Sequence, residues 1–246
     1  MKRVKLYILI LLLCVGARAF AQNEQPYLCE LGLQGGIGYY VGDATPHIFM
    51  NPREAYGLHF RYKFTKRWAA QAKLSGQRVY GTNNRPGTSV PTFENRLYNF
   101  DIMGEFNFFR FGSEKNYDDR IKPFTPYIFL GIGTGWNCSD SSMVGSRTKL
   151  AWSSIYIPFG IGFKWKFSDR WGLNIAWQHN IYLPINKKDG STELNWGDNI
   201  EGVDELNNPN GLNGNNIMNM DLTGMLTVGI VVEFGQAKKP CRICNE

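Results

Sequence analysis

The sequence predicts an all-β fold, an eight-stranded antiparallel transmembrane β-barrel with a side-chain-filled lumen. Three observations predict it. Apolar and polar residues alternate with a period of two in segment after segment, as in strands with two different faces. The chain holds 27 glycines and 14% aromatic residues, yet no apolar run of about 18 residues follows its N-terminal segment. That N-terminal segment has the pattern of an export signal.

The N-terminal segment has the three parts of a secretory signal peptide. Residues 2–5 include three basic side chains, residues 6–15 are apolar, and Ala19-Phe20-Ala21 gives the small–x–small cleavage pattern. The apolar part is too short to span a membrane. We therefore expect a signal peptide at 1–21, an outer-membrane β-barrel at 22–234 and a periplasmic C-terminal tail at 235–246.

The net charge gives no support for a nucleic-acid partner. The whole chain has 27 basic and 21 acidic residues, but the signal peptide holds four of the basic ones and no acidic one. The mature chain therefore has 23 basic against 21 acidic residues, a net charge of +2. Nucleic-acid binding domains are usually far more basic. The histidines and cysteines show no zinc spacing, and we expect no metal and no cofactor.

The alternation is clearest in residues 55–64. Every even position there is leucine, tyrosine or phenylalanine, whereas every odd position is alanine, glycine, histidine, arginine or lysine. Five further segments alternate in the same way, and two glycine-rich segments alternate more weakly. Each is long enough for a tilted membrane strand of about 9–11 residues. The expected strands are 28–42, 55–64, 68–77, 97–108, 124–136, 155–167, 171–181 and 222–234.

The connections between these strands differ in length at the two ends of the barrel. Residues 64–68 (Phe-Thr-Lys-Arg-Trp) and 167–171 (Phe-Ser-Asp-Arg-Trp) are near-copies of one tight turn flanked by aromatic residues. Aromatic girdles and short periplasmic turns are typical of outer-membrane barrels, whose external loops are longer. The expected external loops are 43–54, 81–94, 138–151 and 186–218, and 110–123 is an enlarged periplasmic connection.

The direction of the apolar face separates two kinds of barrel. A soluble, lipocalin-like barrel turns its apolar face inward, whereas a membrane barrel turns it outward. Charges of both signs on the polar face favour the membrane barrel, because opposite charges can pair inside a narrow lumen. A lumen filled in this way argues against a pore. The expected polar plug is His59, Arg61, Lys63, Lys73, Asp101, Glu105, Lys164 and Lys166, with Asp221 and Glu233 as further acidic partners.

Some eight-stranded barrels modify lipids, which requires a base beside a nucleophile or acid. Among His47, His59 and His179, only His179 lies on an apolar face near the outer end of a strand. It is either a base at the lipid surface or an imidazole at the membrane interface. We favour the second and expect no catalytic residue. Loop 186–218 is rich in acidic and asparagine side chains, but it matches no calcium-loop spacing.

The C-terminal tail carries two thiols, Cys241 and Cys244, in a short basic segment. Because an even number of strands brings both chain ends to one side, the tail lies in the periplasm. Cys29, at the start of the first strand, is a third thiol on that side. Two interpretations stay open: an intramolecular disulfide or frayed tail, and a docking tail that binds, or forms a disulfide with, a periplasmic partner.

The chain resembles the PorG family, the small outer-membrane barrels of the type IX secretion system. The most specific segment is a glycine-rich strand that runs into Tyr40-Val41-Gly42-Asp43. The resemblance rests on five segments in order: Glu30–Asp43, Ala55–Tyr62, Lys66–Ala72, Asp101–Phe109 and Thr125–Gly133.

This resemblance implies a role without catalysis. Members of the family are essential for export of cargo that carries a C-terminal signal, and they lie beside a periplasmic ring made by a lipoprotein and its partner protein. The implied role is to anchor or position that ring, and the implied partners are outer-membrane lipid and the ring proteins. The alternatives are a structural or adhesive barrel that acts through its external loops, and a lipid-modifying enzyme.

Overall fold

A computed structural model describes residues 27–41, 48–49, 51–81, 93–112, 121–139, 150–183 and 222–236. The expected signal peptide, His47, loop 186–218, Asp221 and the two tail cysteines lie outside these residues. Within them, no helix is long and apolar enough to cross a membrane.

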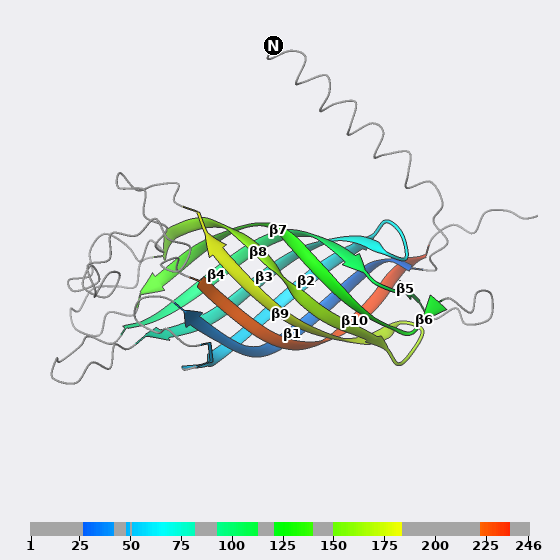
Figure 1. The fold of residues 1–246 in the computed structure, drawn as a ribbon, viewed down its shortest axis with the longest axis horizontal. Helices are drawn as coiled ribbons and strands as arrows, with labels where there is room; N and C mark the ends of the chain where they lie inside the picture. Colours follow the sequence, from blue (N-terminus) through cyan, green and yellow to red (C-terminus); the bar gives the residue numbers. More distant parts are fainter. Residues whose placement is uncertain are drawn as a thin grey trace, which may run out of the picture.

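Eight long strands form a closed barrel in which every neighbouring pair is antiparallel (Figure 1). The order around the barrel is β1-β10-β9-β8-β7-β4-β3-β2. Each strand overlaps one that the sequence predicted, so the predicted fold is confirmed. The strands are β1 (Tyr27–Val41), β2 (Arg53–Lys63), β3 (Trp68–Gly81), β4 (Phe93–Asn107), β7 (Phe124–Ser139), β8 (Leu150–Lys166), β9 (Trp171–Tyr182) and β10 (Leu222–Gln236).

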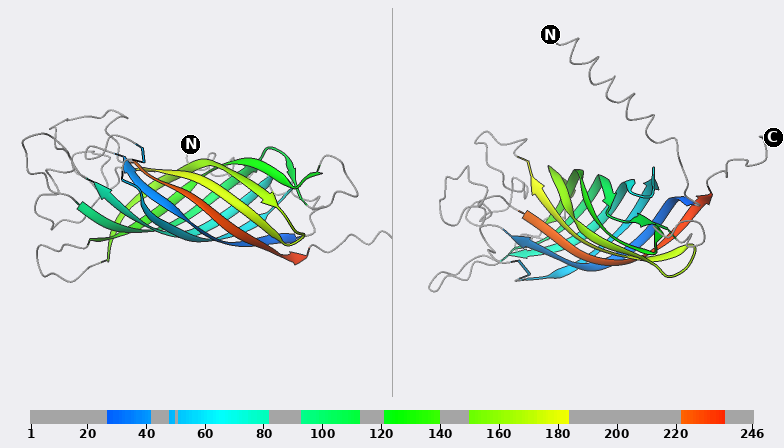
Figure 2. Two further views of the ribbon diagram at one scale, coloured as in Figure 1. Left: turned by 90° about the horizontal axis from the view of Figure 1, so that it is seen from below. Right: turned by 45° about the vertical axis from the view of Figure 1, so that its right-hand side comes forward.

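The first and last strands close the barrel. Their register runs from Tyr27 opposite Gln236 to Val41 opposite Leu222. The start of β1 and the end of β10 therefore lie at the same end of the barrel, as Figures 1 and 2 show. We call this the turn end, because residues 64–67 and 167–170 also connect strands there. The opposite end, where β1, β3, β7 and β9 finish, is called the loop end.

The two tight turns share one hydrogen-bond pattern. The backbone N–H groups of Phe64 and Thr65 both donate to the Trp68 carbonyl, at 3.0 and 3.1 Å, and residues 167 and 168 do the same toward Trp171. The hydroxyl of Thr65 also accepts a hydrogen bond of 2.9 Å from the Trp68 N–H. A side chain that satisfies backbone groups in this way is a local reason for the tight reversal.

The enlarged connection after β4 lies against the barrel where the structure describes it. Its described residues form two short strands, β5 (Arg110–Phe111) and β6 (Ile121–Lys122), which pair in parallel. The Phe111 N–H also donates to the Lys66 carbonyl at 3.2 Å, which ties β5 to the neighbouring turn. Phe111 and Ile121 are buried, whereas Lys122 is exposed. This connection therefore covers the turn end with apolar side chains.

Side chains alternate between the outer surface and the lumen, most regularly in β2 and β9. In β2 the odd residues from Ala55 to Lys63 are buried and the even residues are exposed. The outer surface is apolar on every strand, which is far more apolar surface than a water-exposed barrel normally shows. Each strand contributes one of these exposed side chains: Leu33, Leu58, Leu74, Ile102, Leu130, Ile161, Trp171 and Ile230.

Candidate functional site

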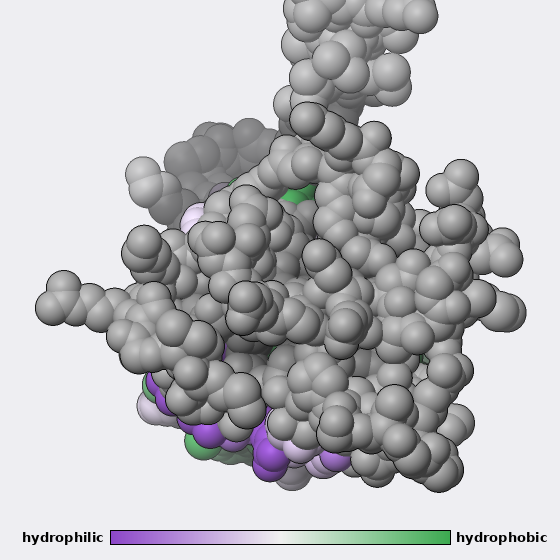
Figure 3. Space-filling model, turned by 90° about the vertical axis from the view of Figure 1, so that its left-hand side faces the viewer, coloured by the Kyte–Doolittle hydropathy of each residue, from purple (hydrophilic) through white to green (hydrophobic). Residues whose placement is uncertain are grey.

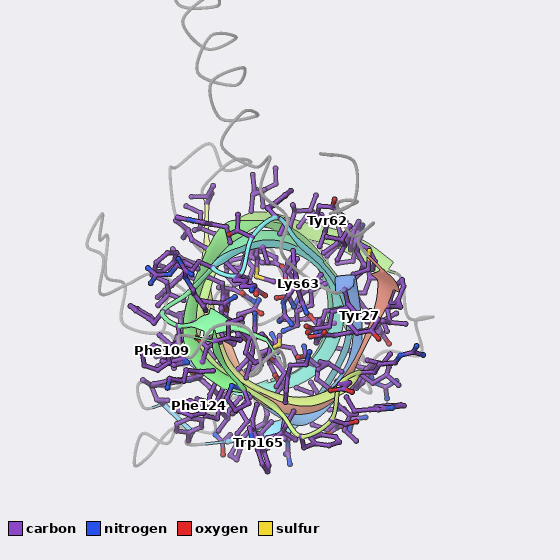
Figure 4. All side chains as sticks on the ribbon, turned by 90° about the vertical axis from the view of Figure 1, so that its right-hand side faces the viewer. Tyr27, Tyr62, Lys63, Phe109, Phe124 and Trp165 are labelled. Carbon is purple, nitrogen blue, oxygen red and sulfur yellow. The ribbon has the colours of Figure 1, made fainter. Side chains whose placement is uncertain are left out.

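The charged residues of the barrel gather in its lumen. All eight residues of the predicted plug are buried there, on β2, β3, β4 and β8. Viewed from the turn end, Lys63 points into the barrel, whereas Tyr62, Phe109, Phe124 and Trp165 lie around its outside (Figure 4). The lumen is therefore the polar core of the protein, and the rim carries an aromatic girdle.

Seven buried charged residues, five of them from the predicted plug, form one chain of ion pairs with alternating signs near the turn end. Lys166 contacts Glu233 at 2.7 Å, and Glu233 also pairs with Lys63. Lys63 lies 3.4 Å from Glu30, which pairs with Arg61. Arg61 and Lys164 then share Glu105, at 2.8 and 2.5 Å. In a lumen shielded from water, such alternation gives each charge an opposite neighbour and offsets the cost of burial.

Glu105 is the carboxylate that Arg61 and Lys164 share near one end of this chain. It extends from β4 toward Arg61 on β2 and Lys164 on β8, two strands that face each other across the barrel. The ring of Tyr127 adds a cation–π contact, with the Lys164 ammonium 4.2 Å from its centroid. The Tyr127 hydroxyl donates to Asn174 at 2.9 Å. Side chains thus span the full width of the lumen at this level.

Glu30 is the charged lumen residue that the sequence analysis missed. It is fully buried and lies directly opposite both Arg61 and Glu233 in the strand register. Two carboxylates that face each other across a strand pair repel. Lys63 lies within salt-bridge distance of both and offsets that repulsion. The alternation of Leu31 and Leu33 with polar or small residues was the available signal, but the glycines of this strand obscured it.

A second tier of polar contacts crosses the lumen nearer the loop end. Lys73 of β3 donates to Gln178 of β9 at 2.8 Å, and these two strands also face each other. Gln178 donates in turn to Asp101 at 3.0 Å, and Asp101 accepts a further hydrogen bond of 2.5 Å from Tyr156. The network continues from Gln178 to Asn180. Two cross-bridges at different heights therefore hold the barrel wall together from inside.

His59 occupies the lumen between the two tiers. Its side chain is completely buried, its Nε2 lies 3.8 Å from Glu30, and neither ring nitrogen has a hydrogen-bond partner among the described residues. The side chains of Gln34, Ser75 and Asn99 also hold buried polar atoms without a protein partner. They lie in one row of the register, across Gly57. Buried polar atoms grouped in this way are typical positions for ordered water.

The apolar cover of the turn end lies directly over the ion-pair chain. The ring of Phe111 has the ammonium groups of Lys63 and Lys166 at 5.8 and 6.0 Å from its centroid. Phe111 therefore separates the ammonium groups of Lys63 and Lys166 from the solvent at that end.

His179 faces outward, in an aromatic cluster near the loop end. Its ring stacks on Phe159 at 5.5 Å and lies 4.9 Å from the ring of Trp177. The Trp177 indole donates to the Tyr39 hydroxyl at 2.7 Å, and that hydroxyl lies 3.3 Å from His179 Nδ1. An indole nitrogen can only donate, so the Tyr39 oxygen accepts from Trp177, and the direction of its contact with Nδ1 depends on the tautomer of His179. The described partners of His179 are thus aromatic rings and a phenol.

Of the three thiols expected at the turn end, the structure describes Cys29 only. It is half-buried and unbridged, at the start of β1 opposite Phe234. A side chain built at Gly235 would lie 3.5 Å from its sulfur. Cys29 is therefore next to the point where the expected tail begins.

Three solved outer-membrane or surface proteins are similar to the chain. Neisserial surface protein A is 12% identical, over 84% of this chain and 97% of that one, with a TM-score of 0.49. Ail of Yersinia pestis, in complex with the heparin analogue sucrose octasulfate, is 10% identical over 85% and 100%, with a TM-score of 0.46. OprG of Pseudomonas aeruginosa is 12% identical over 87% and 99%, with a TM-score of 0.45.

No curated protein sequence matches the chain. A family model does match, however, over residues 7–216, which is most of the sequence. Together with the closed barrel and its apolar outer surface, this match gives the protein an outer-membrane location. The chain belongs to the outer membrane protein beta-barrel domain family.

Proposed function

We propose that this barrel is a non-enzymatic component of the type IX protein secretion system, and that it anchors or positions the periplasmic ring of that machine. The observation that carries the proposal is the lumen crossed by the Arg61–Glu105–Lys164 bridge. A barrel closed in this way is a rigid membrane anchor and not a conduit for exported cargo.

The resemblance to the PorG family supports the secretion role. Its five segments fall on β1, β2, β3, β4 and β7, which are consecutive around the barrel. They include the lumen residues Glu30, Arg61, Asp101 and Glu105 as well as outward-facing positions. The resemblant segments thus lie on five neighbouring strands of the eight, and a function shared with that family would use this part of the barrel wall.

In the proposed orientation the turn end faces the periplasm and the loop end faces outward. The start of β1, the end of β10, the girdle of aromatic side chains and the β5–β6 cover all lie at the turn end, where they can meet the lipoprotein of the ring and its partner. The tail with Cys241 and Cys244 starts beside Cys29. We propose that these three thiols dock a ring protein or form a disulfide with it. The polar plug, in this proposal, keeps the barrel rigid and closed.

The first test is a clean deletion with plasmid complementation, followed by mass spectrometry of the culture medium and the cell surface. The expected result is that signal-bearing cargo accumulates in the periplasm and returns outside on complementation. If the exported proteins are unchanged, the secretion role is wrong. The external loops would then be tested by deleting residues 190–214 and measuring adhesion, and His179→Ala would be tested for a changed lipid profile.

The docking role of the thiols has its own test. Wild-type protein and the Cys241→Ser/Cys244→Ser variant are cross-linked in cells and purified, and the captured ring proteins are compared. Cys29→Ser is compared as a third variant, because it shows how much of the capture depends on the thiol in the barrel wall. Equal recovery of ring proteins by the double variant and the wild type contradicts docking through the tail, and it leaves the secretion role itself untouched.

A further inference from the structure

A short piece of the connection between β1 and β2 packs against the outer wall of the barrel. It consists of Ile48 and Phe49, which form a turn, and we call these two residues the strap. The centroid of the Phe49 ring lies 4.7 Å from that of Tyr39 on β1. The same ring stacks on Trp177 of β9, with the two centroids 6.3 Å apart. The strap therefore bridges β1 and β9, the two neighbours of β10 in the barrel.

The strap lies on a platform of aromatic side chains, formed by Tyr39, Phe159, Trp177 and His179. The Trp177 indole donates to the Tyr39 hydroxyl at 2.7 Å. The His179 ring lies 4.9 Å from the ring of Trp177 and 5.5 Å from that of Phe159. Gly224 of β10 is the register partner of both Tyr39 and His179, and a Cβ there would lie 2.3 Å from the Tyr39 ring. Because β10 has no side chain at this position, the platform can extend over it from β1 to β8.

The burial of Tyr39 shows how closely the strap packs. Tyr39 shares the outward-facing side of β1 with Ile37, whose side chain is 37% exposed, yet Tyr39 itself is only 1% exposed. An outward side chain becomes buried where another part of the chain covers it, and the Phe49 ring is such a cover in direct contact. The strap thus shields part of the platform from the surroundings of the barrel.

The backbone of Phe49 indicates that its ring contacts hold the strap in place. Its φ of +64° is the left-handed conformation, and Phe49 is the one non-glycine residue with a positive φ in the described part of the chain. Bulky residues rarely adopt this conformation, which persists where the surrounding structure enforces it. The ring contacts with Tyr39 and Trp177 can supply that constraint.

The platform lies inside the apolar band of the wall. His179 comes eight residues after Trp171, the first residue of β9 at the turn end. At a rise of roughly 3.3 Å per residue, this separation is about 26 Å along the strand. A strand tilt of about 40° reduces it to roughly 20 Å, which is less than the apolar band of about 25 Å in such barrels. The strap, which packs on this platform, therefore lies near the upper edge of the band.

The outer side of the strap is apolar. Ile48 is 48% exposed and Phe49 is 40% exposed, close to the 49% of Val228 on the wall. Figure 3 looks onto the loop end, where hydrophobic side chains lie among hydrophilic ones along the lower edge of the described surface. Aromatic and aliphatic side chains at this level of a membrane lie between the headgroups and the acyl chains. The strap therefore continues the apolar surface of the wall.

We propose that Ile48 and Phe49 insert into the outer-leaflet lipid and hold the first external connection against the barrel wall. Phe49 packs on Tyr39 and Trp177, and Ile48 contacts the acyl chains beside them. The assignment to the outer leaflet rests on the orientation proposed above, with the loop end outside. The contact with lipid and the dependence on the aromatic platform rest neither on that orientation nor on the secretion role.

The test measures the surroundings of the strap in the folded barrel, in phosphatidylcholine vesicles. Ile48→Cys, in a chain whose native cysteines are replaced by serine, carries an environment-sensitive fluorophore. Ile230→Cys on the exposed wall and Ser168→Cys in an exposed tight turn carry the same label, as references for lipid and for water. The quenchers are iodide in the water and a lipid with a nitroxide near the top of its acyl chain. We expect the nitroxide lipid to quench the Ile48 label several-fold more than the Ser168 label, and iodide to quench it several-fold less.

Variants of the labelled Ile48→Cys chain then test what holds the strap. Trp177→Leu removes one ring of the platform but keeps an apolar side chain, so the label should become several-fold more accessible to iodide. The matched control is Trp165→Leu, the same substitution at an exposed tryptophan near the turn end, which should change nothing. Phe49→Gly suits the positive φ but lacks the ring, so it should release the label as Trp177→Leu does. Heat-dependent migration in gels checks that each variant is folded.

Four results would overturn the proposal. Iodide that quenches the Ile48 label as strongly as the Ser168 label would place the strap in water, and protection from both quenchers would mean that protein covers it. An effect of Trp165→Leu as large as that of Trp177→Leu would mean a general loosening of the wall. A Phe49→Gly chain that keeps the label in lipid would mean that the turn, and not the ring, holds the strap. None of these results bears on secretion, which the deletion experiment tests in cells.

Discussion

The two ion pairs that Glu105 makes across the lumen lead to the sharpest stability prediction. Glu105 is fully buried and is the shared acceptor of Arg61 and Lys164. Glu105→Gln keeps the size and one acceptor oxygen of the side chain but removes its charge. Arg61 would retain Glu30, whereas Lys164 would keep only a neutral contact of 3.2 Å to Asn107. The chain would then hold four cations and two carboxylates.

The size of the effect follows from burial. Removing one partner of a buried ion pair typically costs about 3–5 kcal/mol, because the other charge stays in the interior. The matched control is Glu54→Gln, which breaks the Arg78 pair on the surface, where the Glu54 side chain is 55% exposed. Such a pair contributes about 0–1 kcal/mol. The expected difference between the two variants is therefore at least about 2 kcal/mol.

The assay is equilibrium unfolding in urea of barrels refolded into lipid vesicles, followed by tryptophan fluorescence. A second variant sharpens the result. In Glu105→Gln/Lys164→Met the Lys164 ammonium that would lack a carboxylate is also removed. The loss of unfolding free energy should therefore be smaller than the sum of the losses in the two single variants, by about 0.5–3 kcal/mol. If Glu105→Gln costs no more than Glu54→Gln, the ion-pair chain does not stabilise the barrel and our account of the lumen is wrong.

Three further predictions test the outer surface and the cover of the turn end. Gly224→Ala should cost about 1–3 kcal/mol, because its Cβ would lie 2.3 Å from the Tyr39 ring; adding Tyr39→Ala should relieve part of this loss, and strictly additive losses in urea unfolding would contradict it. Val228→Arg, in mid-strand on the outer surface, should cost about 2–4 kcal/mol in vesicles, whereas Phe234→Arg near the rim should cost about 0–1; equal effects would mean that this face does not contact the lipid core. Phe111→Ala should raise several-fold the rate at which a water-soluble succinimidyl ester acylates the lumen lysines at the turn end, measured by peptide mass spectrometry, and an unchanged rate would show that Phe111 does not cover them.

The sequence was sufficient for the fold because a membrane barrel has one strong rule. Outward side chains must be apolar and lumen side chains need not be, so residues such as Leu58 and His59 differ sharply in polarity at every step. Strand ends were harder to predict, since alternation fades where strands leave the membrane. β4 and β8 begin four and five residues earlier than their apolar pattern indicated.

The lumen was only partly predictable. The odd or even position of a residue in its strand decides whether its side chain faces the lumen, and the plug residues follow from this rule. The rule says nothing about which side chains meet across the barrel. The Lys73–Gln178 and Arg61–Glu105 contacts depend on the diameter of the barrel and on strand order. Tyr127 and Tyr156 were not predicted as lumen residues, because the plug was chosen from charged side chains and His59. The cover formed by Phe111 and Ile121 had no periodic signal at all, because β5 and β6 have two residues each.

The seam between β1 and β10 has a consequence for how the barrel is made. Lys63 and Glu233 are 170 residues apart, and Glu30 meets Glu233 only when the last strand arrives beside the first. Before closure Lys63 of β2 lacks that carboxylate, whereas Lys166 of β8 is already on the same side of the seam as Glu233. An open sheet in lipid would therefore expose an incompletely paired set of charges along its inner face. Hairpins can form early, but the polar interior is completed in a single late event. We therefore expect closure, and not hairpin formation, to limit the folding rate, as is usual when the decisive contacts are distant in sequence.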